Sequence, residues 1–297
     1  MKTIFETNIP DLKLRHRGKV RDIYDLGNYL LFVATDRISA FDVIMNEPVE
    51  GKGSILANIS AFWFQLTKHI IPNHFITSNF YEYPESCSPY KDQLIGRSML
   101  VVKCEPLPIE AVVRGHIAGS GWKEYQQSQT ICGHSLPQNL QEFAKLPEPI
   151  FTPATKEEQG HDININFEQM ADIIGAELAN KVKDTSLKLF NFGSNYLMKK
   201  GLILADTKFE FGLTKDGTLI LIDEVMTPDS SRIWLSDEYA PGKSQYNFDK
   251  QILRDYLESI DWNKQYPPPA LPESIIQATL EKYKEAQKRI IENAIKL

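Results

Sequence analysis

Acidic and basic side chains alternate along one apolar segment in the C-terminal half of the chain. In "LADTKFEFG", Asp206, Lys208 and Glu210 are two residues apart, so on a β-strand their side chains share one face. An Asp-Gly step at 216–217, a strong hairpin signal, separates this run from a second apolar run. A two-residue turn at that step places Glu210 directly opposite Asp223. A bulge would shift this register by one residue and separate the two acids.

Two carboxylates that face each other across a strand pair repel and destabilise a bare sheet. A divalent cation between them reverses that effect, and Mg²⁺ commonly binds one or two carboxylates together with substrate phosphates. Lys208 beside them would neutralise a phosphate or carboxylate of the substrate. The alternative is a solvated hairpin face, but the apolar residues on both arms do not suit an exposed hairpin. We therefore predict Glu210 and Asp223 as Mg²⁺ ligands.

A second candidate site lies in "EAVVRGHIAGSGWKEY". Arg114 ends an apolar strand, and the loop after it, with Gly115, Gly119, Ser120 and Gly121, opens into a predicted helix. A guanidinium, a hydroxyl, backbone N–H groups and a helix N-terminus together suit a phosphate monoester. The alternative is a flexible loop that carries a surface arginine.

A third basic segment, "RHRGKVRDIYD", precedes a predicted strand-turn-strand unit. Gly18 and Lys19 could lay backbone N–H groups and an ammonium over phosphates. The segment does not have Walker A spacing, and "EGKGS" at 50–54 also lacks it because the position of the first glycine is occupied by Asn46. A basic strand edge with a turn glycine explains the same pattern.

Two further loops carry polar residues directly after predicted strands. "TPDSSR" supplies Asp229, Ser230, Ser231 and Arg232 in a compact turn that could hold an anion. "DRISAFD" supplies Asp36, Ser39 and Asp42. Loops that follow strands often carry ligand contacts. A turn held by local side-chain hydrogen bonds is the alternative for the second loop.

Composition excludes several classes of protein. The 297 residues have a net charge of −6, which gives no reason to expect a nucleic acid or an anionic membrane as partner. Three cysteines without C-x-x-C spacing fit a reducing cytosol, and no apolar run is long enough to predict export or a membrane span. Zinc-hydrolase histidine pairs and a G-x-S-x-G elbow are absent from the sequence. The remaining chemistry, positioning with metal and cationic stabilisation, is typical of phosphoryl transfer.

The elements that must position these residues follow from periodicity and breakers. We expect a helix from about 55 to 70 with Ser54 as N-cap and Pro72 beyond its end, and a long helical stretch from 168 to 200 that ends at Gly201. The other expected elements are strands within 19–45 and 98–113, a weakly structured stretch at 137–165, a helix at 248–260 and a polar C-terminal helix after 272. We assign the last helix to packing only. Strands first and mixed elements later predict an α+β fold with two lobes and a cleft.

In their order along residues 13 to 260, these segments resemble the SAICAR synthase family of purine biosynthesis, in its longer single-chain form. The motifs are "GKVRDIYDLG", "DRISAFD", "EAVVRGHIAGSGWKEY", "FTPATKEEQGHD", "LADTKFEFG" and "IDEVMTPDSSRIW". The resemblance implies a cytoplasmic, monomeric ligase that joins carboxyaminoimidazole ribonucleotide (CAIR) to L-aspartate and converts ATP to ADP and phosphate with Mg²⁺. It also implies a kinase-like N-lobe that covers the nucleotide (1–110). The rest of the chain (111–297) then forms an ATP-grasp-like C-lobe that binds substrates and metal.

The resemblance also assigns roles to single residues. Glu210 and Asp223 are the implied Mg²⁺ ligands. The residues implied for ATP are Gly18, Lys19, Val20 and Arg21 over the phosphates, with Lys103 and Glu105 near adenine. Those implied for the ribonucleotide are Asp36, Ser39, Arg114, Gly115 and Ser120. Those implied around the reacting carboxylate and the substrates are Lys208, Asp229, Ser230 and Arg232, with Lys156 and Asp162 in a motif near the substrates.

Two alternatives use the same apparatus. A small-molecule kinase of two-lobed build would also need ATP and Mg²⁺, but it would transfer phosphate to a hydroxyl acceptor. A regulatory nucleotide-binding protein would not need the whole set of Lys19, Lys208, Glu210 and Asp223. ADP release that requires both CAIR and L-aspartate separates the ligase from both.

Overall fold

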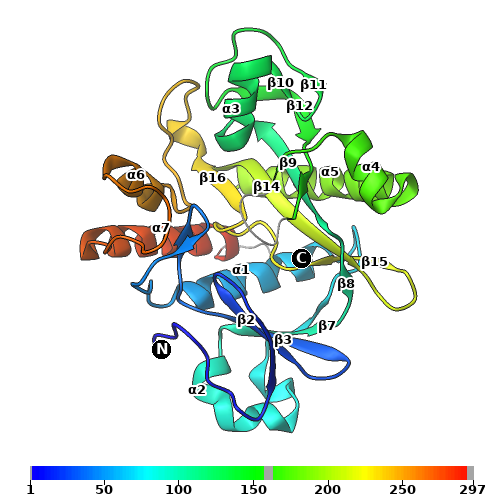
Figure 1. Cartoon of the computed structure of the whole chain (residues 1–297), viewed down its shortest axis with the longest axis vertical. Coiled ribbons are helices and arrows are strands. Elements are labelled where there is room, and N and C mark those ends of the chain that lie inside the picture. Colours follow the sequence, from blue (N-terminus) through cyan, green and yellow to red (C-terminus); the bar gives the residue numbers. More distant parts are fainter. Residues whose placement is uncertain (1, 157–162, 293–297) are drawn as a thin grey trace.

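Two antiparallel sheets form the framework of the computed structural model, which describes residues 2–156 and 163–292. In Figure 1 the N-terminal sheet lies below and the second sheet above it. The first sheet has the order β1 (Lys13–Arg17), β2 (Arg21–Asp25), β3 (Tyr29–Ala34), β7 (Ser98–Val102) and β6 (Phe75–Thr77). Every strand in it is antiparallel to its neighbours.

The second sheet is built around β14 (Leu202–Leu213), a strand of 12 residues. Its main path is β12 (Lys145–Phe151), β9 (Ile109–His116), β14 and β15 (Leu219–Ile222). Three short strands add to it: β16 (Ser231–Leu235) and β8 (Glu105–Pro106) beside β14, and β13 (Ala154–Thr155) beside β9. Two small hairpins are β4 (Ser39–Ala40) with β5 (Val43–Ile44), and β10 (Thr130–Ile131) with β11 (His134–Ser135).

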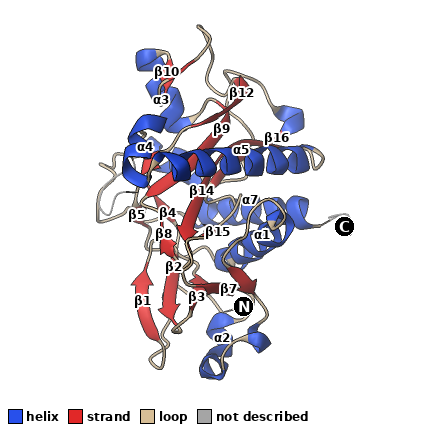
Figure 2. Cartoon of the chain, turned by 90° about the vertical axis from the view of Figure 1, so that its right-hand side faces the viewer, coloured by secondary structure: helices blue, strands red, loops and turns tan. Residues whose placement is uncertain are grey.

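The helices cover these sheets and fill the space between them. Figure 2 shows α5 crossing the seven-stranded sheet, and α1 and α7 side by side below it. The α-helices are α1 (Lys52–Thr67), α2 (Lys91–Leu94), α3 (Gly119–Ser128), α4 (Phe167–Ile174), α5 (Ala176–Met198), α6 (Gln251–Ser259) and α7 (Glu273–Ile291). Short 3-10 turns are η1 (Phe80–Glu82), η2 (Glu85–Tyr90) and η3 (Ser236–Glu238). The predicted α+β class is confirmed. None of the helices in the described ranges combines the length and apolar character needed to cross a bilayer.

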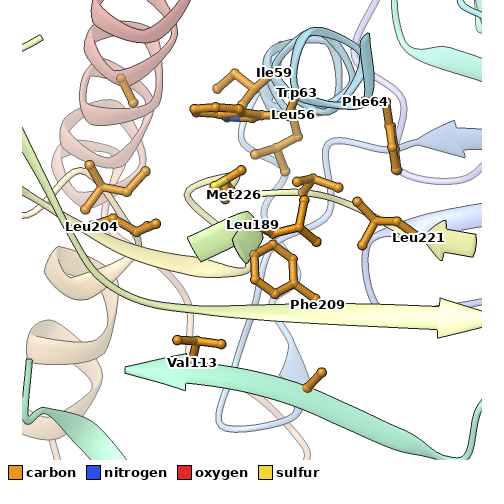
Figure 3. Packing of buried hydrophobic residues seen from close by; sticks show 14 of the residues in the cluster. Leu56, Ile59, Trp63, Phe64, Val113, Leu189, Leu204, Phe209, Leu221 and Met226 are labelled. Carbon is orange, nitrogen blue, oxygen red and sulfur yellow. The ribbon is translucent and has the colours of Figure 1, made fainter. Parts of the chain in front are cut away.

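One apolar core runs from the first sheet through α1 into the second sheet. In Figure 3, Trp63 and Phe64 of α1 lie on one side of Leu189, Phe209 and Leu221, which come from α5, β14 and β15. All five of these side chains are buried completely. Burial of side chains this large is the main favourable term in folding, so the shared core holds the two sheets against each other. The predicted division into lobes at residue 110 falls within β9, and it remains a prediction.

A short strap also ties the sheets together by backbone hydrogen bonds. Leu221 of β15 donates its N–H to the carbonyl of Pro72 and accepts from the N–H of His74. The carbonyl of His74 in turn accepts from Val102 of β7 at 2.7 Å. The strap therefore links the last residue of a strand in the first sheet to the hairpin of the second.

The predicted helix boundaries were wrong at two places. Helix α1 begins after Gly51, whose φ of 84° suits glycine, and Ser54 lies inside it with its hydroxyl donating to the carbonyl of Gly96. The stretch from 168 to 200 forms two helices, because Gly175, with a φ of 87°, interrupts the helical backbone between α4 and α5. Residues 137–165, expected to be weakly structured, contain β12 and β13.

The predicted hairpin register was also wrong, by one residue. Glu210 pairs with Ile222, and Leu213 pairs with Leu219. The loop has three residues instead of two, since Thr214 donates its N–H to Thr218 and Gly217 closes the turn at φ 81°.

The side chain of Asp216 accounts for this loop. Its carboxylate accepts hydrogen bonds from the hydroxyls of Thr214 and Thr218, and these bonds favour the longer turn over a two-residue turn. As a result, Asp223 lies one residue beyond the strand, at φ 68°, and not directly opposite Glu210.

Candidate active site

A cavity of about 790 Å³ opens where residues of both sheets meet. This volume is in the range of small-molecule sites. Among the described residues, nine lysines and arginines and six acids line it, a local excess of three positive charges in a chain with a net charge of −6. Such a cavity attracts anionic substrates although the whole protein is acidic.

Strand β14 supplies the floor of the cavity. The ammonium of Lys208 donates to Glu210 at 2.9 Å and to Glu110 of β9 at 2.5 Å, and Lys156 donates to the other oxygen of Glu210. Burial opposes ionisation of Glu210, but Lys208 and Lys156 outweigh it and hold the pKa of this carboxyl well below its usual range. Burial likewise lowers the pKa of Lys208, but Glu210 and Glu110 raise it well above the ordinary value. Both groups are therefore charged at neutral pH.

The second predicted metal ligand lies on the same cavity wall. Arg21 of β2 donates to Asp223 at 2.7 Å and contacts Glu224 at 3.5 Å, so a residue of the first sheet reaches the acids that follow β15. Burial opposes the charge of Arg21, but these two acids raise its pKa above the ordinary value. Burial raises the pKa of Glu224, whose carboxylate also accepts a hydrogen bond from Thr227 at 2.5 Å.

Two guanidiniums share one carboxylate on β14, four residues before Glu210. Asp206 accepts from Arg232 of β16 at 2.6 Å and from Arg114 of β9 at 3.3 Å, and it pairs with both residues across the sheet. Arg114 also donates to the hydroxyl of Ser120 in the first turn of α3. A Cβ atom on Gly119 would lie 2.2 Å from Arg232, so the close approach of this arginine to α3 requires glycine.

The first sheet contributes the segment between β1 and β2. Gly18, Lys19, Val20 and Arg21 all line the cavity, as does Ser39 of β4. The buried guanidinium of Arg37 holds this segment in place by donating to the carbonyls of Gly18 and Lys19. The ammonium of Lys19 pairs with Asp42 in the β4–β5 turn.

Several predicted site residues do not reach the cavity. Asp36 is fully buried, and its carboxylate accepts from the N–H groups of Ile4 and Gly53 and pairs with Arg97 at 3.0 Å. It stabilises the start of α1, and its predicted contact with the ribonucleotide stays a prediction. Arg114 is also buried, and it reaches the cavity wall through Ser120.

Four other predicted residues are not among the residues that line the cavity. Lys103 pairs with Asp25 at 2.7 Å, and Glu105 lies in β8 where the chain crosses between the sheets. Gly115 packs against Phe190 of α5, and Ser230 bonds within its own turn. Asp162 falls outside the described residues.

Comparison with known proteins identifies the family. The family model for SAICAR synthetase matches residues 14–269. A phosphoribosylaminoimidazole-succinocarboxamide synthase of Pelobacter propionicus is 57% identical over 288 residues, with 97% of each chain covered. The chain belongs to the SAICAR synthetase family. The family predicted from the motifs is thereby confirmed.

Other SAICAR synthetases extend the comparison. A relative in Geotalea uraniireducens is 57% identical and covers 96% of each chain. The solved structure of the Saccharomyces cerevisiae SAICAR synthase complexed with SAICAR has a TM-score of 0.86 at 43% identity, covering 98% of this chain and 97% of that one. A SAICAR synthetase structure in complex with ADP has a TM-score of 0.70 at 28% identity, covering 95% and 99%.

The predictions missed several charged residues that line the cavity. They are Glu110, Lys123, Glu224, Lys250, Arg254 and Lys264. For Lys250 and Arg254 a signal was present, because a spacing of four residues places both on one face of the predicted helix that became α6. For Lys264 no helix or strand pattern was available, since it lies in the connection between α6 and α7.

The residues present fit the metal that the SAICAR synthetase resemblance implies. The described residues contain no cluster of three or more His, Cys, Asp or Glu side chains arranged to hold an ion by themselves. Two carboxylates that line the cavity, Glu210 and Asp223, are the kind of donor that Mg²⁺ uses when substrate phosphates complete its shell.

Proposed function

We propose that this chain joins the carboxylate of CAIR to the amine of L-aspartate, with conversion of ATP to ADP and phosphate. Relatives more than 50% identical over nearly the full length carry the name of this synthase. The observation that carries the proposal is the arrangement along β14. One face of this strand joins a two-arginine pocket at Asp206 to an acidic end at Glu210, with Lys208 between them.

Each part of the cavity suits one part of the substrates. The pocket formed by Arg232, Ser120 and the first turn of α3, backed by Arg114, suits the phosphate of a ribonucleotide. The segment from Gly18 to Arg21 suits the phosphates of ATP, as the neighbouring structure in complex with ADP supports for the family. Glu210 and Asp223 would hold Mg²⁺, which neutralises phosphate charge during phosphoryl transfer.

Two bond exchanges account for the overall reaction. An oxygen of the CAIR carboxylate attacks the γ-phosphorus of ATP, and the bond to the ADP oxygen breaks. The amine of aspartate then attacks the carbonyl carbon of this acyl phosphate, phosphate leaves with the electron pair of the C–O bond, and the nitrogen loses a proton. Because the pKa of Lys208 is raised, its ammonium supplies a fixed positive charge to the reacting carboxylate and does not act as a base at neutral pH.

A turnover assay with purified protein tests this function. We expect ADP release with ATP, Mg²⁺ and CAIR to depend on L-aspartate, and the product to have the mass of the succinocarboxamide. ADP release that proceeds at full rate without aspartate, with phosphate on a hydroxyl acceptor, would support a small-molecule kinase instead. Binding of ATP without any turnover would support a regulatory protein.

We also propose that the enzyme is a cytoplasmic monomer and that residues 1–110 act as a lobe that covers the nucleotide. The odd number of unpaired cysteines and the family resemblance support these statements. Light scattering after size-exclusion chromatography measures the oligomeric state, and fractionation of cells measures the location.

A further inference from the structure

The carboxylate of Asp229 is held from behind by two side chains that do not line the cavity. Lys52 of α1 donates to one oxygen at 2.7 Å, and Tyr283 of α7 donates to the other at 2.6 Å. Both are completely buried, whereas Asp229 itself lies on the cavity wall. Residues 52, 229 and 283 thus bring two packed helices to one point of the site.

Burial of a charged lysine and a tyrosine hydroxyl at this position lowers the stability of the fold unless their interaction with Asp229 compensates. A fully buried ammonium loses its hydration, and among the described residues Asp229 is the only hydrogen-bond acceptor of both Lys52 and Tyr283. Apolar side chains of similar size commonly stabilise a buried position at least as well as an ion pair does. Packing of α1 against α7 therefore does not explain why Lys52 and Tyr283 occupy these positions.

The two donors give the carboxylate a single orientation. Asp229 follows β15 in a turn, where the hydroxyl of Thr227 accepts its N–H, and a side chain in such a turn could otherwise rotate. With both oxygens held from behind, the remaining lone pairs face the cavity, where the ammonium of Lys250 lies 3.9 Å away. Burial opposes ionisation, but Lys250 and Lys52 outweigh it and hold the pKa of Asp229 well below its usual range.

We propose that Lys52 and Tyr283 are positioning residues of the active site, which keep the carboxylate of Asp229 aimed at N–H donors of the bound substrates. This inference rests on the proposed function. It makes the C-terminal helix α7 part of the catalytic apparatus. It also gives the lysine of "EGKGS" a role that is unrelated to phosphate binding.

Tyr283→Phe is the sharpest test, because it removes one oxygen atom and keeps the ring in place. We expect kcat for aspartate-dependent ADP release to fall about tenfold, as for loss of one hydrogen bond to a charged group, with the KM for ATP unchanged. Lys52→Met should lower kcat further. Tyr196→Phe is the matched control, since the hydroxyl of Tyr196 bonds the carbonyl of Ile290 in the same helix and does not touch Asp229. Its kcat should equal that of the unmodified chain.

A double-mutant cycle separates positioning from packing. In an Asp229→Asn background, Tyr283→Phe should no longer change kcat, because the carboxylate that it orients is gone. An equal loss in both backgrounds, or an equal loss in Tyr196→Phe, would overturn the inference. So would an unchanged kcat together with a lower Tm. Failure of the proposed function would look different, since the unmodified chain would then lack aspartate-dependent turnover.

Discussion

Replacing Gly119 by alanine should damage the phosphate pocket more than the fold. The new Cβ would lie 2.2 Å from Nη2 of Arg232, whereas ordinary contacts begin near 3.4 Å. The guanidinium must therefore move by more than about 1 Å. This movement stretches its 2.6 Å bond to Asp206 beyond a good hydrogen-bond length. Gly119 also has φ +56°, a conformation that costs a residue with a Cβ atom about 1–2 kcal/mol.

The two effects have different measurable consequences. Backbone strain lowers Tm, by roughly 2–4 °C per kcal/mol in a chain of this size. Displacement of Arg232 weakens a charge-assisted bond to the phosphate of CAIR, worth about 1.5–3 kcal/mol, and so raises the KM for CAIR about 10- to 100-fold. The KM for ATP should stay unchanged because the nucleotide segment lies on the other sheet.

Gly217→Ala is the matched control for this prediction. Gly217 has φ +81°, yet a Cβ there meets nothing within 4 Å, and the residue lies at the hairpin tip. The control should lower Tm by a similar amount and leave both KM values unchanged. If Gly119→Ala lowered Tm like the control and kept an ordinary KM for CAIR, the proposed pocket would be refuted.

Three further predictions address the metal, the ribonucleotide and pH. Glu210→Gln or Asp223→Asn should abolish Mg²⁺-dependent ADP release and leave the circular dichroism spectrum unchanged, because each removes one of two acidic ligands. Arg114→Ala should raise the KM for CAIR far more than that for ATP in steady-state assays, because Ser120 and Asp206 lose their support. Burial and the charge of Lys145 lower the pKa of His116 from 6.5 to about 4, so the folded state binds fewer protons than the unfolded state between these values. Protonation of this ring on unfolding should therefore lower the free energy of unfolding of the unmodified chain between pH 7 and pH 5. In His116→Phe that loss should be smaller by about 2 kcal/mol, as measured by urea unfolding.

Each of these has an outcome that contradicts it. Near-normal turnover in Glu210→Gln or Asp223→Asn would refute the assignment of these residues as Mg²⁺ ligands. Equal changes in both KM values would argue against a role of Arg114 at the ribonucleotide. Identical pH dependence of unfolding in both chains would mean that His116 is not buried as a neutral ring.

Local patterns were enough to predict most of the elements and many of the residues that line the cavity. Alternation along β14 placed Asp206, Lys208 and Glu210 on one face, because the side-chain period of a strand is two. The segment around Lys19 and the turn with Arg232 were found from charge next to glycine or strand ends, and both line the cavity.

The missed features depend on partners that are distant in the chain. The hairpin register was decided by bonds of the Asp216 side chain, which a turn signal does not contain. Lys52 lies at the start of an otherwise apolar helix, and only the fold brings it to Asp229, 177 residues later in the chain. Tyr283 looked like one more packing residue in a polar helix for the same reason. Secondary-structure propensity depends on residues close together in the sequence, whereas these contacts join residues that only tertiary packing brings together.

In the proposed binding mode, the spacing of side chains along β14 sets the length of substrate that fits the cavity. From Asp206 to Glu210 the strand advances four residues, about 13 Å at the rise of a β-strand. Asp206 is paired with β16 on one side and β9 on the other, and Glu210 is paired with β15, so the sheet holds this span at a fixed length. A ribonucleotide can hold its phosphate at one end and present its carboxylate at the other only if its own length matches. Deleting two residues between Asp206 and Glu210 would keep both side chains on the same face, but the cavity would then fit a substrate about 7 Å shorter.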